Sequence, residues 1–185
     1  MDTSTKTKRR YEPDRRDRII DVTLDVIAQY GVAGTTHRRV AEAADVPLGA
    51  MTYYFKGMDD LLQQAFTRLA ETMSLEFQQH LAAATTREQA CQVIIDWACD
   101  GLWTNERNLV LIFELSALAA RRPNMRPLVQ RWMGVTADYL HRYFSPTEAK
   151  LLDAFIDGLL IRNIVSPDNI SREEVTLFVQ KVTLP

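Results

Sequence analysis

Cysteine is scarce in this sequence, with only two occurrences in 185 residues. Cys91 and Cys99 lie eight positions apart in a segment with helical spacing, so their Cα atoms should be roughly 12 Å apart. A disulfide needs Cα atoms within about 7 Å of each other, and we therefore expect two buried, reduced thiols. The hydrophobic fraction of 46% is large enough for a packed core without cross-links.

Long apolar runs are also absent. No segment has the roughly 18 uncharged apolar residues that a membrane-spanning helix requires. Residues 1–12 contain basic side chains and no apolar stretch, so they resemble neither a signal peptide nor a membrane anchor. The sequence therefore predicts a cytoplasmic protein that does not contact a membrane.

The residue sets that enzymes and metalloproteins use are missing as well. No nucleophile stands beside a general base, no glycine-rich phosphate loop occurs, and the histidines, cysteines and carboxylates show no convincing metal-ligand spacing. We therefore expect a protein without catalytic residues, cofactor or metal ion. A helical enzyme is the weaker alternative.

Positive charge is not in excess, since the formal net charge is −2 and residues 1–60 carry ten Lys and Arg against ten Asp and Glu. The chain as a whole therefore has no general attraction to nucleic acid. Basic residues nevertheless cluster within residues 6–18 and again at Arg38 and Arg39. Local clusters suit phosphate contacts, and the alternative is a set of solvated charges.

From Asp14 onward the apolar residues recur at helical spacing, and no sustained alternation typical of strands occurs. The chain is therefore predicted to be all-α. Helices in the second half are expected near 87–104, 107–120, 124–144, 147–164 and 171–183. Capping-box spacing marks three of their starts, at Thr86, Ser145 and Ser171.

The first 60 residues show the order of a helix-turn-helix unit, in which an apolar helix precedes two short helices and a long one. Gly31 and Gly34 should end the first helix. A hydroxyl of Thr35 or Thr36 should cap the second helix, and Pro47 should separate the second from the third.

The third of these helices, over residues 48–55, has two different faces. Met51 and Phe55 lie four residues apart and can pack inward together. The largely outward residues are then Ala50, Thr52, Tyr53 and Tyr54. The second member of a helix-turn-helix lies in the major groove, so its outer face must be polar or small. Residues 48–55 are therefore predicted to form a DNA-recognition helix.

These residues together resemble a family signature. The run from Gly31 to Ala41 with Ala44, the run from Gly49 to Phe55, and the pair Leu61-Leu62 resemble the TetR family of transcriptional regulators. The resemblance covers residues 15–66, and residues 46–55 resemble in particular the branch that includes the regulator RcdA.

The resemblance implies a fold and a function. The expected fold has about nine helices, with a flexible basic arm over residues 1–12, a three-helix DNA-binding domain over 13–58, and a helical ligand-binding and dimerisation domain over 59–185. The expected function is that of a homodimer that binds a palindromic operator in double-stranded DNA, usually as a repressor, under control of a small-molecule effector. A helical adaptor that does not bind DNA is the alternative, and the lack of net positive charge is its only support.

By matching position, the resemblance implies DNA contacts in the arm, the second helix, the third helix and the loop that follows. These residues are Lys8, Arg9, Arg10, Thr36, Arg38, Arg39, Leu48, Gly49, Ala50, Thr52, Tyr53, Tyr54 and Lys56. Arg and Tyr can donate hydrogen bonds to phosphates, and a Thr or Ala methyl can contact a thymine methyl. For the two tyrosines the alternative is packing under the turn, and for the arm it is a disordered tail.

Three residues depart from the family pattern. Asp45 stands in the turn where glycine is usual, Thr52 where tyrosine is common, and Met58 where a phosphate-binding lysine usually begins the fourth helix. Met58 cannot donate to a phosphate. We therefore expect either that Lys56 or the arm compensates, or that DNA affinity is lower.

The second half of the chain carries the residues expected to bind the effector and a second copy. Aromatic candidates for an effector cavity are Trp97, Trp103, Phe113, Trp132 and Tyr139, each of which has core packing as its alternative. Candidates for a two-fold helical interface are Leu152, Phe155, Ile156, Leu159, Phe178 and Val182, because the last two helices carry more apolar surface than they need internally. Packing within one chain is the alternative.

Overall fold

The computed structural model describes residues 14–101, 104–166, 168 and 170–183. Within these residues every regular element is helical, so the predicted all-α class is confirmed. The elements are α1 (Arg15–Gly34), α2 (His37–Ala43), α3 (Leu48–Tyr54), α4 (Met58–Ala82), α5 (Arg87–Asp100), α6 (Glu106–Arg121), η2 (Pro123–Met125), α7 (Arg126–Leu140), α8 (Pro146–Val165) and α9 (Arg172–Thr183). Two expected helices differ: the one expected near 87–104 ends at Asp100, and residues 124–144 contain part of a 3-10 turn followed by the shorter α7.

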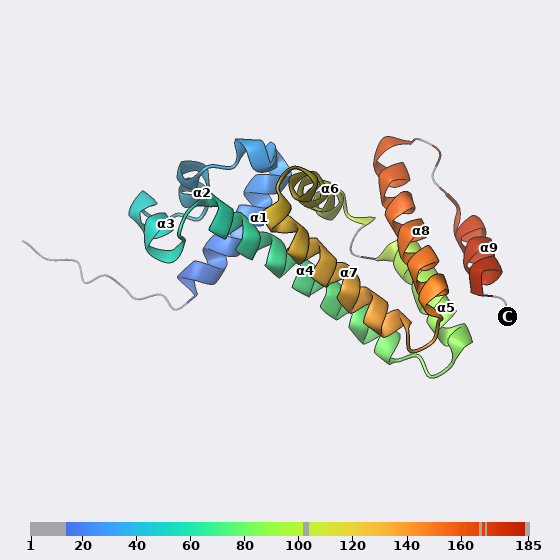
Figure 1. Ribbon diagram of the computed structural model, residues 1–185. Helices are drawn as coiled ribbons and strands as arrows, with labels where there is room; N and C mark the ends of the chain where they lie inside the picture. The colour runs from blue at the N-terminus through green and yellow to red at the C-terminus, as the bar shows by residue number, and fades with distance from the viewer. Residues whose placement is uncertain (1–13, 102–103, 167, 169, 184–185) are drawn as a thin grey trace, which may run out of the picture.

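The long helix α4 joins two parts of the molecule (Figure 1). We call α1 to α3, residues 15–54, the head, and α4 to α9, residues 58–183, the body. In the head, α2 and α3 lie beyond α1 at one end of the molecule, whereas α5, α8 and α9 lie at the other end. Along its length α4 packs first against α1 and then against α7, so it runs from the head through the body.

Side-chain caps start several helices where the sequence predicted them. The Thr36 hydroxyl accepts the backbone amide of Arg39 at 3.2 Å and begins α2. At α8, the Ser145 hydroxyl accepts the amide of Glu148 and the Glu148 carboxylate accepts the amide of Ser145, which is the predicted capping box. The Ser145 amide, together with the Arg87 guanidinium, lowers the pKa of Glu148 to about 2. These caps satisfy amides that have no partner within their helix.

The first helix bends at Gly31 instead of ending there. Gly31 has a φ of 68°, in the left-handed region, and α1 resumes until Gly34. A side chain at Gly31 would be strained, and its Cβ would lie 2.9 Å from the Glu114 carboxylate oxygen of α6. Glycine therefore permits α6 to approach the end of α1.

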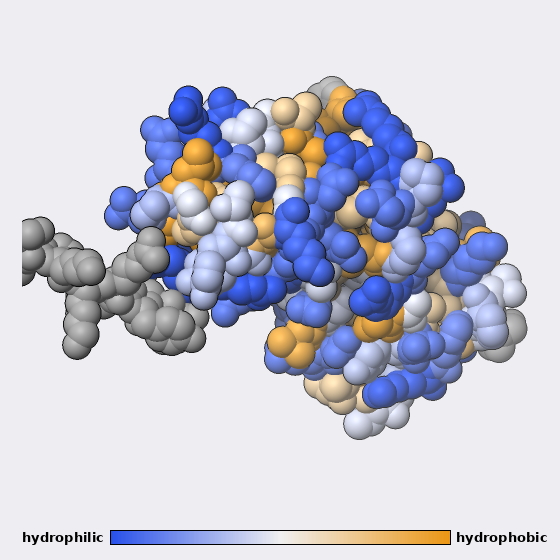
Figure 2. Space-filling view, turned by 60° about the vertical axis from the view of Figure 1, so that its left-hand side comes forward, coloured by the Kyte–Doolittle hydropathy of each residue, from blue (hydrophilic) through white to orange (hydrophobic). Residues whose placement is uncertain are grey.

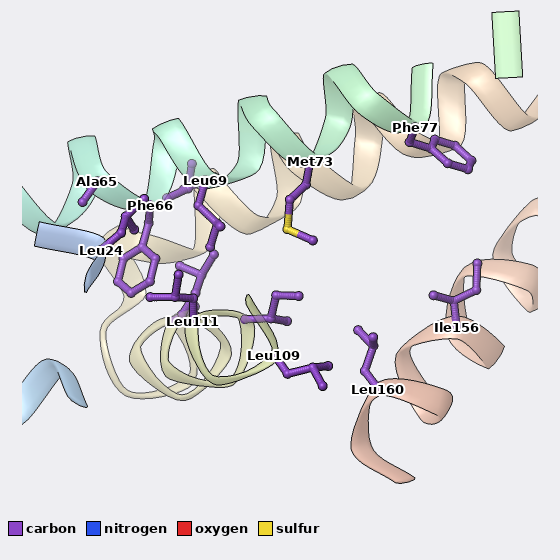
Figure 3. Close-up of a cluster of buried hydrophobic side chains, with 14 of the residues drawn as sticks. Leu24, Ala65, Phe66, Leu69, Met73, Phe77, Leu109, Leu111, Ile156 and Leu160 are labelled. Carbon is purple, nitrogen blue, oxygen red and sulfur yellow. The ribbon is translucent and has the colours of Figure 1, made fainter. Parts of the chain in front are cut away.

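One hydrophobic core extends through both parts (Figure 3). Leu24 of α1, Phe66 of α4 and Leu111 of α6 gather where the head meets the body, and Met73 continues the core along α4. Because a close-packed core transmits displacements between its helices, the head is mechanically connected to the body through α1, α4 and α6.

The surface is mostly hydrophilic in the view of Figure 2, with small, separate hydrophobic areas. Among the described residues, no helix combines the length and apolar character that crossing a membrane requires. Cys91 and Cys99 are free thiols, as expected, but each is half-buried and not fully buried.

Candidate DNA-binding face and ligand cavity

The turn between α2 and α3 is tight and contains a strained residue. Asp45 has a φ of 51°, the only left-handed residue other than glycine in the described chain. The Val46 amide then donates to the Ala41 carbonyl at 2.9 Å, which closes the turn. This is the position where the sequence departs from the expected glycine, and aspartate tolerates the left-handed region better than most residues.

The inner and outer faces of α3 are those that the sequence predicted. Met51 and Phe55 are buried against the core of the head. Tyr53 is 80% exposed and Thr52 is also exposed, while Tyr54 is half-buried. The rings of Tyr53 and Tyr54 are nearly perpendicular, with 4.8 Å between their centroids. Packing under the turn, the alternative considered for both tyrosines, therefore applies in part to Tyr54 and not to Tyr53.

The start of α3 leaves open space for a large partner. Leu48 and Gly49 are exposed, and a Cβ built on Gly49 would meet no atom within 4 Å. Ala50 is half-buried. The exposed surface of α3 therefore begins with the small or apolar residues Leu48 and Gly49 and ends with Thr52 and Tyr53.

The basic residues predicted to contact DNA differ in how exposed their side chains are. Arg38 and Lys56 are exposed, as is the cap residue Thr36. Arg39, in contrast, donates to the Gly34 carbonyl and lies over the Tyr30 ring at 4.2 Å from its centroid. Lys8, Arg9 and Arg10 lie outside the described residues.

The loop before α4 is arranged around an acidic residue. The Asp60 carboxylate accepts the backbone amide of Lys56 at 2.9 Å, and this hydrogen bond is the main cause of the lowered pKa of Asp60. Met58, the first residue of α4, is half-buried against the core. Its side chain thus fills a packing position and offers no donor to DNA.

A cavity of about 120 Å³ lies within the body. Its lining comes from α4, α5, α6, α7 and α8 and consists of Phe77, Trp97, Ile112, Ser116, Val129, Trp132, Met133, Thr136, Leu140, Asp153, Ile156, Asp157 and Leu160. Figure 3 shows Phe77 of α4 on one side of this region and Ile156 and Leu160 of α8 on the other. Mostly apolar walls with a few polar groups are typical of small-molecule sites.

The structure places two of the five predicted ligand residues in this cavity, Trp97 and Trp132. Phe113 does not line it, because it follows Ile112 by one residue and so points about 100° away around α6. Tyr139 instead packs against the Arg142 guanidinium, 4.6 Å from its ring centroid, and Trp103 lies outside the described residues.

Sequence reasoning missed the acidic residues of the cavity. Asp153 is half-buried in its wall, and Asp157 is more exposed. Burial, together with the negative charge of Asp157, raises the pKa of Asp153 to about 6, and burial also raises the pKa of Asp157. The i and i+4 spacing of two acids on an apolar helix was the signal that could have found them.

The prediction for the dimer interface needs correction. Leu152 has no exposed surface, and Ile156 and Leu159 are also buried, so these three belong to the interior of one chain. Phe155 stacks on Phe178 of α9 at 3.7 Å between ring centroids. Val182 is half-buried against the core.

The outer face of α8 carries a different apolar row. Its members are Leu151, Ala154, Gly158, Ile161 and Val165, all exposed, and their spacing of three, four, three and four residues keeps them on one side of the helix. Ile161 is 52% exposed and Val165 70%. We call these five residues the α8 stripe.

Helix α6 connects the cavity to the head. Its Ile112 and Ser116 side chains line the cavity, whereas Glu114 lies about 160–200° around the helix from them. The Glu114 carboxylate accepts the backbone amide of Val32 at 2.9 Å, just beyond the bend of α1. An ion pair of 2.6 Å between Arg107 and Asp25 adds a second link between α6 and α1.

The head is a helix-turn-helix unit with an exposed recognition helix, and packed helices connect it to a body that contains a cavity. This combination defines a DNA-binding regulator that responds to a ligand. Comparison with known families agrees. The model described as bacterial regulatory proteins, tetR family, matches residues 19–65, and the model described as tetracyclin repressor-like, C-terminal domain, matches residues 82–183.

Individual proteins show the same likeness. The curated regulator BetI 1 from Chromohalobacter salexigens is 27% identical over 168 residues, which are 86% of this chain and 83% of that protein. The solved structure of SCO7518 from Streptomyces coelicolor A3(2), described as a transcriptional regulator, is 38% identical, covers 94% of this chain and 100% of its own, and has a TM-score of 0.87. The multidrug binding protein EbrR in complex with ethidium is 31% identical, with 93% and 99% covered and a TM-score of 0.75.

This chain therefore belongs to the TetR family of transcriptional regulators, with a DNA-binding N-terminal part and a ligand-binding C-terminal part. The particular likeness to the RcdA branch stays a prediction.

Proposed function

We propose that this protein is a homodimeric repressor that binds a palindromic operator in double-stranded DNA and is released by a small molecule. In this proposal residues 13–58 form the DNA-binding unit, with the arm of residues 1–12 beside it, and residues 59–185 bind the effector and the second copy. The observation that carries the proposal is the outer face of α3, on which Thr52 and Tyr53 are exposed while its inner face is buried.

The residues that contact DNA divide into two groups. Thr52, Tyr53 and the exposed start of α3 face the major groove, with Tyr54 at the edge of that face. Thr36, Arg38 and Lys56 face the phosphates, where exposed donors can bind without breaking contacts inside the protein. We assign Arg39 a positioning role, because its guanidinium already binds the Gly34 carbonyl and the Tyr30 ring.

The α8 stripe is the proposed dimer interface. A regularly spaced apolar row on an exposed helix costs free energy in water and is covered when two copies pack with two-fold symmetry. Gly158 lies within the stripe, and a Cβ there would meet no atom within 4 Å. A second helix can therefore approach α8 closely at this point. Phe155, Phe178 and Val182 flank this interface instead of forming its centre.

Helix α6 transmits the effector signal in this proposal. A ligand against Ile112 and Ser116 displaces α6, and the Glu114 hydrogen bond to Val32 carries that displacement to α1. The spacing of the two heads then no longer fits two half-sites one or more helical turns apart. The ligand shifts the protein toward the head spacing that does not fit the operator only if it binds that state more tightly than the operator-binding state.

The test measures the affinity for DNA from just upstream of the gene at a series of salt concentrations. It compares the wild type with Arg38→Ala. We expect specific binding that weakens with salt. The variant should bind about tenfold more weakly, with a salt slope smaller by about one, because one phosphate contact is lost.

Lys181→Ala is the matched control for that variant, since Lys181 is exposed at the far end of α9. It should bind like the wild type. Equal affinity and equal salt slope for Arg38→Ala and Lys181→Ala would remove the phosphate assignment. Wild-type binding no tighter than to random DNA, both there and at sequences from a genome-wide selection, would overturn DNA recognition itself.

A further inference from the structure

The cavity in the body combines aromatic walls with unbalanced negative charge. Phe77, Trp97 and Trp132 provide the aromatic surface, and Trp97 is almost completely buried. Among the described residues of its lining, Asp153 and Asp157 are the two ionisable side chains, and none is a lysine, arginine or histidine. Ser116 and Thr136 are the other polar residues there, and both are uncharged.

The two carboxylates have no positive partner in the part of the chain that the structure describes. Among the described residues, neither Asp153 nor Asp157 forms an ion pair, whereas Asp17, Asp21, Asp25, Asp59, Asp96 and Asp100 do. The pKa of Asp153 is raised to about 6, mainly by burial, so at neutral pH its carboxylate is mostly ionised. A charge held in a half-buried wall without a partner is costly. A positive charge inside the cavity would remove that cost.

We propose that the effector is a compact, lipophilic organic cation whose positive centre lies beside Asp153 and Asp157 and whose apolar part contacts Trp97 and Trp132. This inference rests on the proposed function and names the chemical class of its effector. Aromatic faces and carboxylates both attract organic cations, and aromatic side chains are commonly used to recognise quaternary ammonium groups.

Other ligand classes fit the cavity less well. An anion would meet two carboxylates, and an uncharged ligand would leave the half-buried Asp153 carboxylate without a partner. A hydrated inorganic cation would have to lose water against mostly apolar walls. EbrR, which is 28–31% identical to this chain, has been solved in complex with ethidium, proflavin and malachite green, all of them aromatic compounds that can carry positive charge.

The test compares two probes of the same shape that differ in charge, phenyltrimethylammonium and tert-butylbenzene. Binding to the full-length protein is followed by calorimetry and by the fluorescence of the tryptophans. We expect the cation to bind at least about tenfold more tightly than the uncharged probe, because only the cation gains the carboxylates. Equal affinity for the two probes, or no binding of the cation, would overturn the inference.

Variants then locate the charge that the probe contacts. Asp153→Asn should weaken cation binding about tenfold and leave tert-butylbenzene binding unchanged, and Asp153→Asn with Asp157→Asn should weaken it further. Asp138→Asn is the matched control, because Asp138 is exposed on α7 and does not line the cavity. Unchanged cation affinity in the double variant would place the binding site elsewhere and overturn the inference.

The failure of this inference can be told apart from a failure of the proposed function. If operator binding is specific but the cation does not bind, the effector class is wrong and the regulator stands. If the cation binds as expected and the two aspartates matter, the cavity takes an organic cation whether or not operator affinity changes. Cation binding without any change in operator affinity would contradict the release step alone.

Discussion

The head and the body position their functional side chains in different ways. In the head, the exposed face of α3 and the start of α2 come from one stretch of about twenty residues, held by Thr36 and the turn at Asp45. In the body, the cavity is lined by residues from 77 to 160 on five different helices. A shift between packed helices therefore changes the cavity, whereas it moves the DNA-binding face as a rigid unit.

The two parts also differ in their electrostatics. Ion pairs join α1 to its neighbours, with Arg68 2.6 Å from Asp17 and 3.0 Å from Asp21, and Arg107 2.6 Å from Asp25. Exposed pairs of this kind contribute little stability singly but hold the geometry as a group. The carboxylates of the cavity have no such partners among the described residues. These ion pairs therefore hold α1 of the head against α4 and α6 of the body, whereas the cavity carboxylates are left for a ligand to balance.

The largest expected effect separates the dimer from the fold of the single chain. Ile161→Glu places a charge in the α8 stripe and should give folded monomers. Because two linked heads bind DNA about 10²–10⁴-fold more tightly than one, operator affinity should fall by at least about 100-fold. Molecular mass in solution and helical content by circular dichroism check the two parts of this outcome.

Leu75→Glu is the control for Ile161→Glu. Leu75 has nearly the same exposure, 54% against 52%, but lies on α4 away from the stripe. It should leave the dimer mass unchanged. A dimer in both variants would show that the interface lies elsewhere.

A smaller effect is expected at the link between the two parts. Glu114→Ala removes the acceptor of the Val32 amide and should lower the free energy of unfolding by about 1–2 kcal/mol. It should also reduce the change in operator affinity that phenyltrimethylammonium causes, because one of the two polar links between α6 and α1 is lost. Chemical denaturation and operator titrations with and without the cation measure these two quantities.

Glu114→Gln sharpens that test, since its side-chain carbonyl can still accept the Val32 amide. We expect it to keep most of the cation response. If Glu114→Ala responds as strongly as Glu114→Gln, this hydrogen bond does not couple the two parts.

The smallest expected change, that of Asp45→Gly, concerns the turn between α2 and α3. Asp45→Gly should raise the free energy of unfolding by up to about 1 kcal/mol, because glycine adopts the left-handed region without strain. Asp45→Val should lower it by about 1–2 kcal/mol, because β-branched residues are strongly disfavoured there. Thermal unfolding of the two variants and the wild type measures these changes. An Asp45→Val variant more stable than the wild type would contradict the strain argument.

Local signals in the sequence predicted the head well. Hydroxyl caps, Pro47 and the four-residue spacing of Met51 and Phe55 act over a few residues, and the structure has α2, α3 and the buried face of α3 where these signals place them. The DNA contacts themselves stay predictions. The strain at Asp45 was visible in the sequence only as a departure from the expected glycine.

The same reasoning was less accurate for α8, for a physical reason. This helix is apolar almost all round, with adjacent pairs such as Leu151 and Leu152 pointing to different sides. Periodicity orients a helix only when one face is polar. The sequence pattern therefore predicted an apolar helix and an interface, but it assigned to the interface two residues that face inward, Leu152 and Leu159.

What the sequence determined by itself is local: the helices, their caps, the breaks between them, and a head whose family signature is contiguous. What only the tertiary structure decided is which distant side chains share a space: Trp97 with Trp132 and Asp153 in the cavity, Glu114 with Val32 at the link, and the row of α8 left on the outside. Caps and turns depend on hydrogen bonds between near neighbours, whereas a cavity depends on how whole helices pack, and no short pattern encodes that packing.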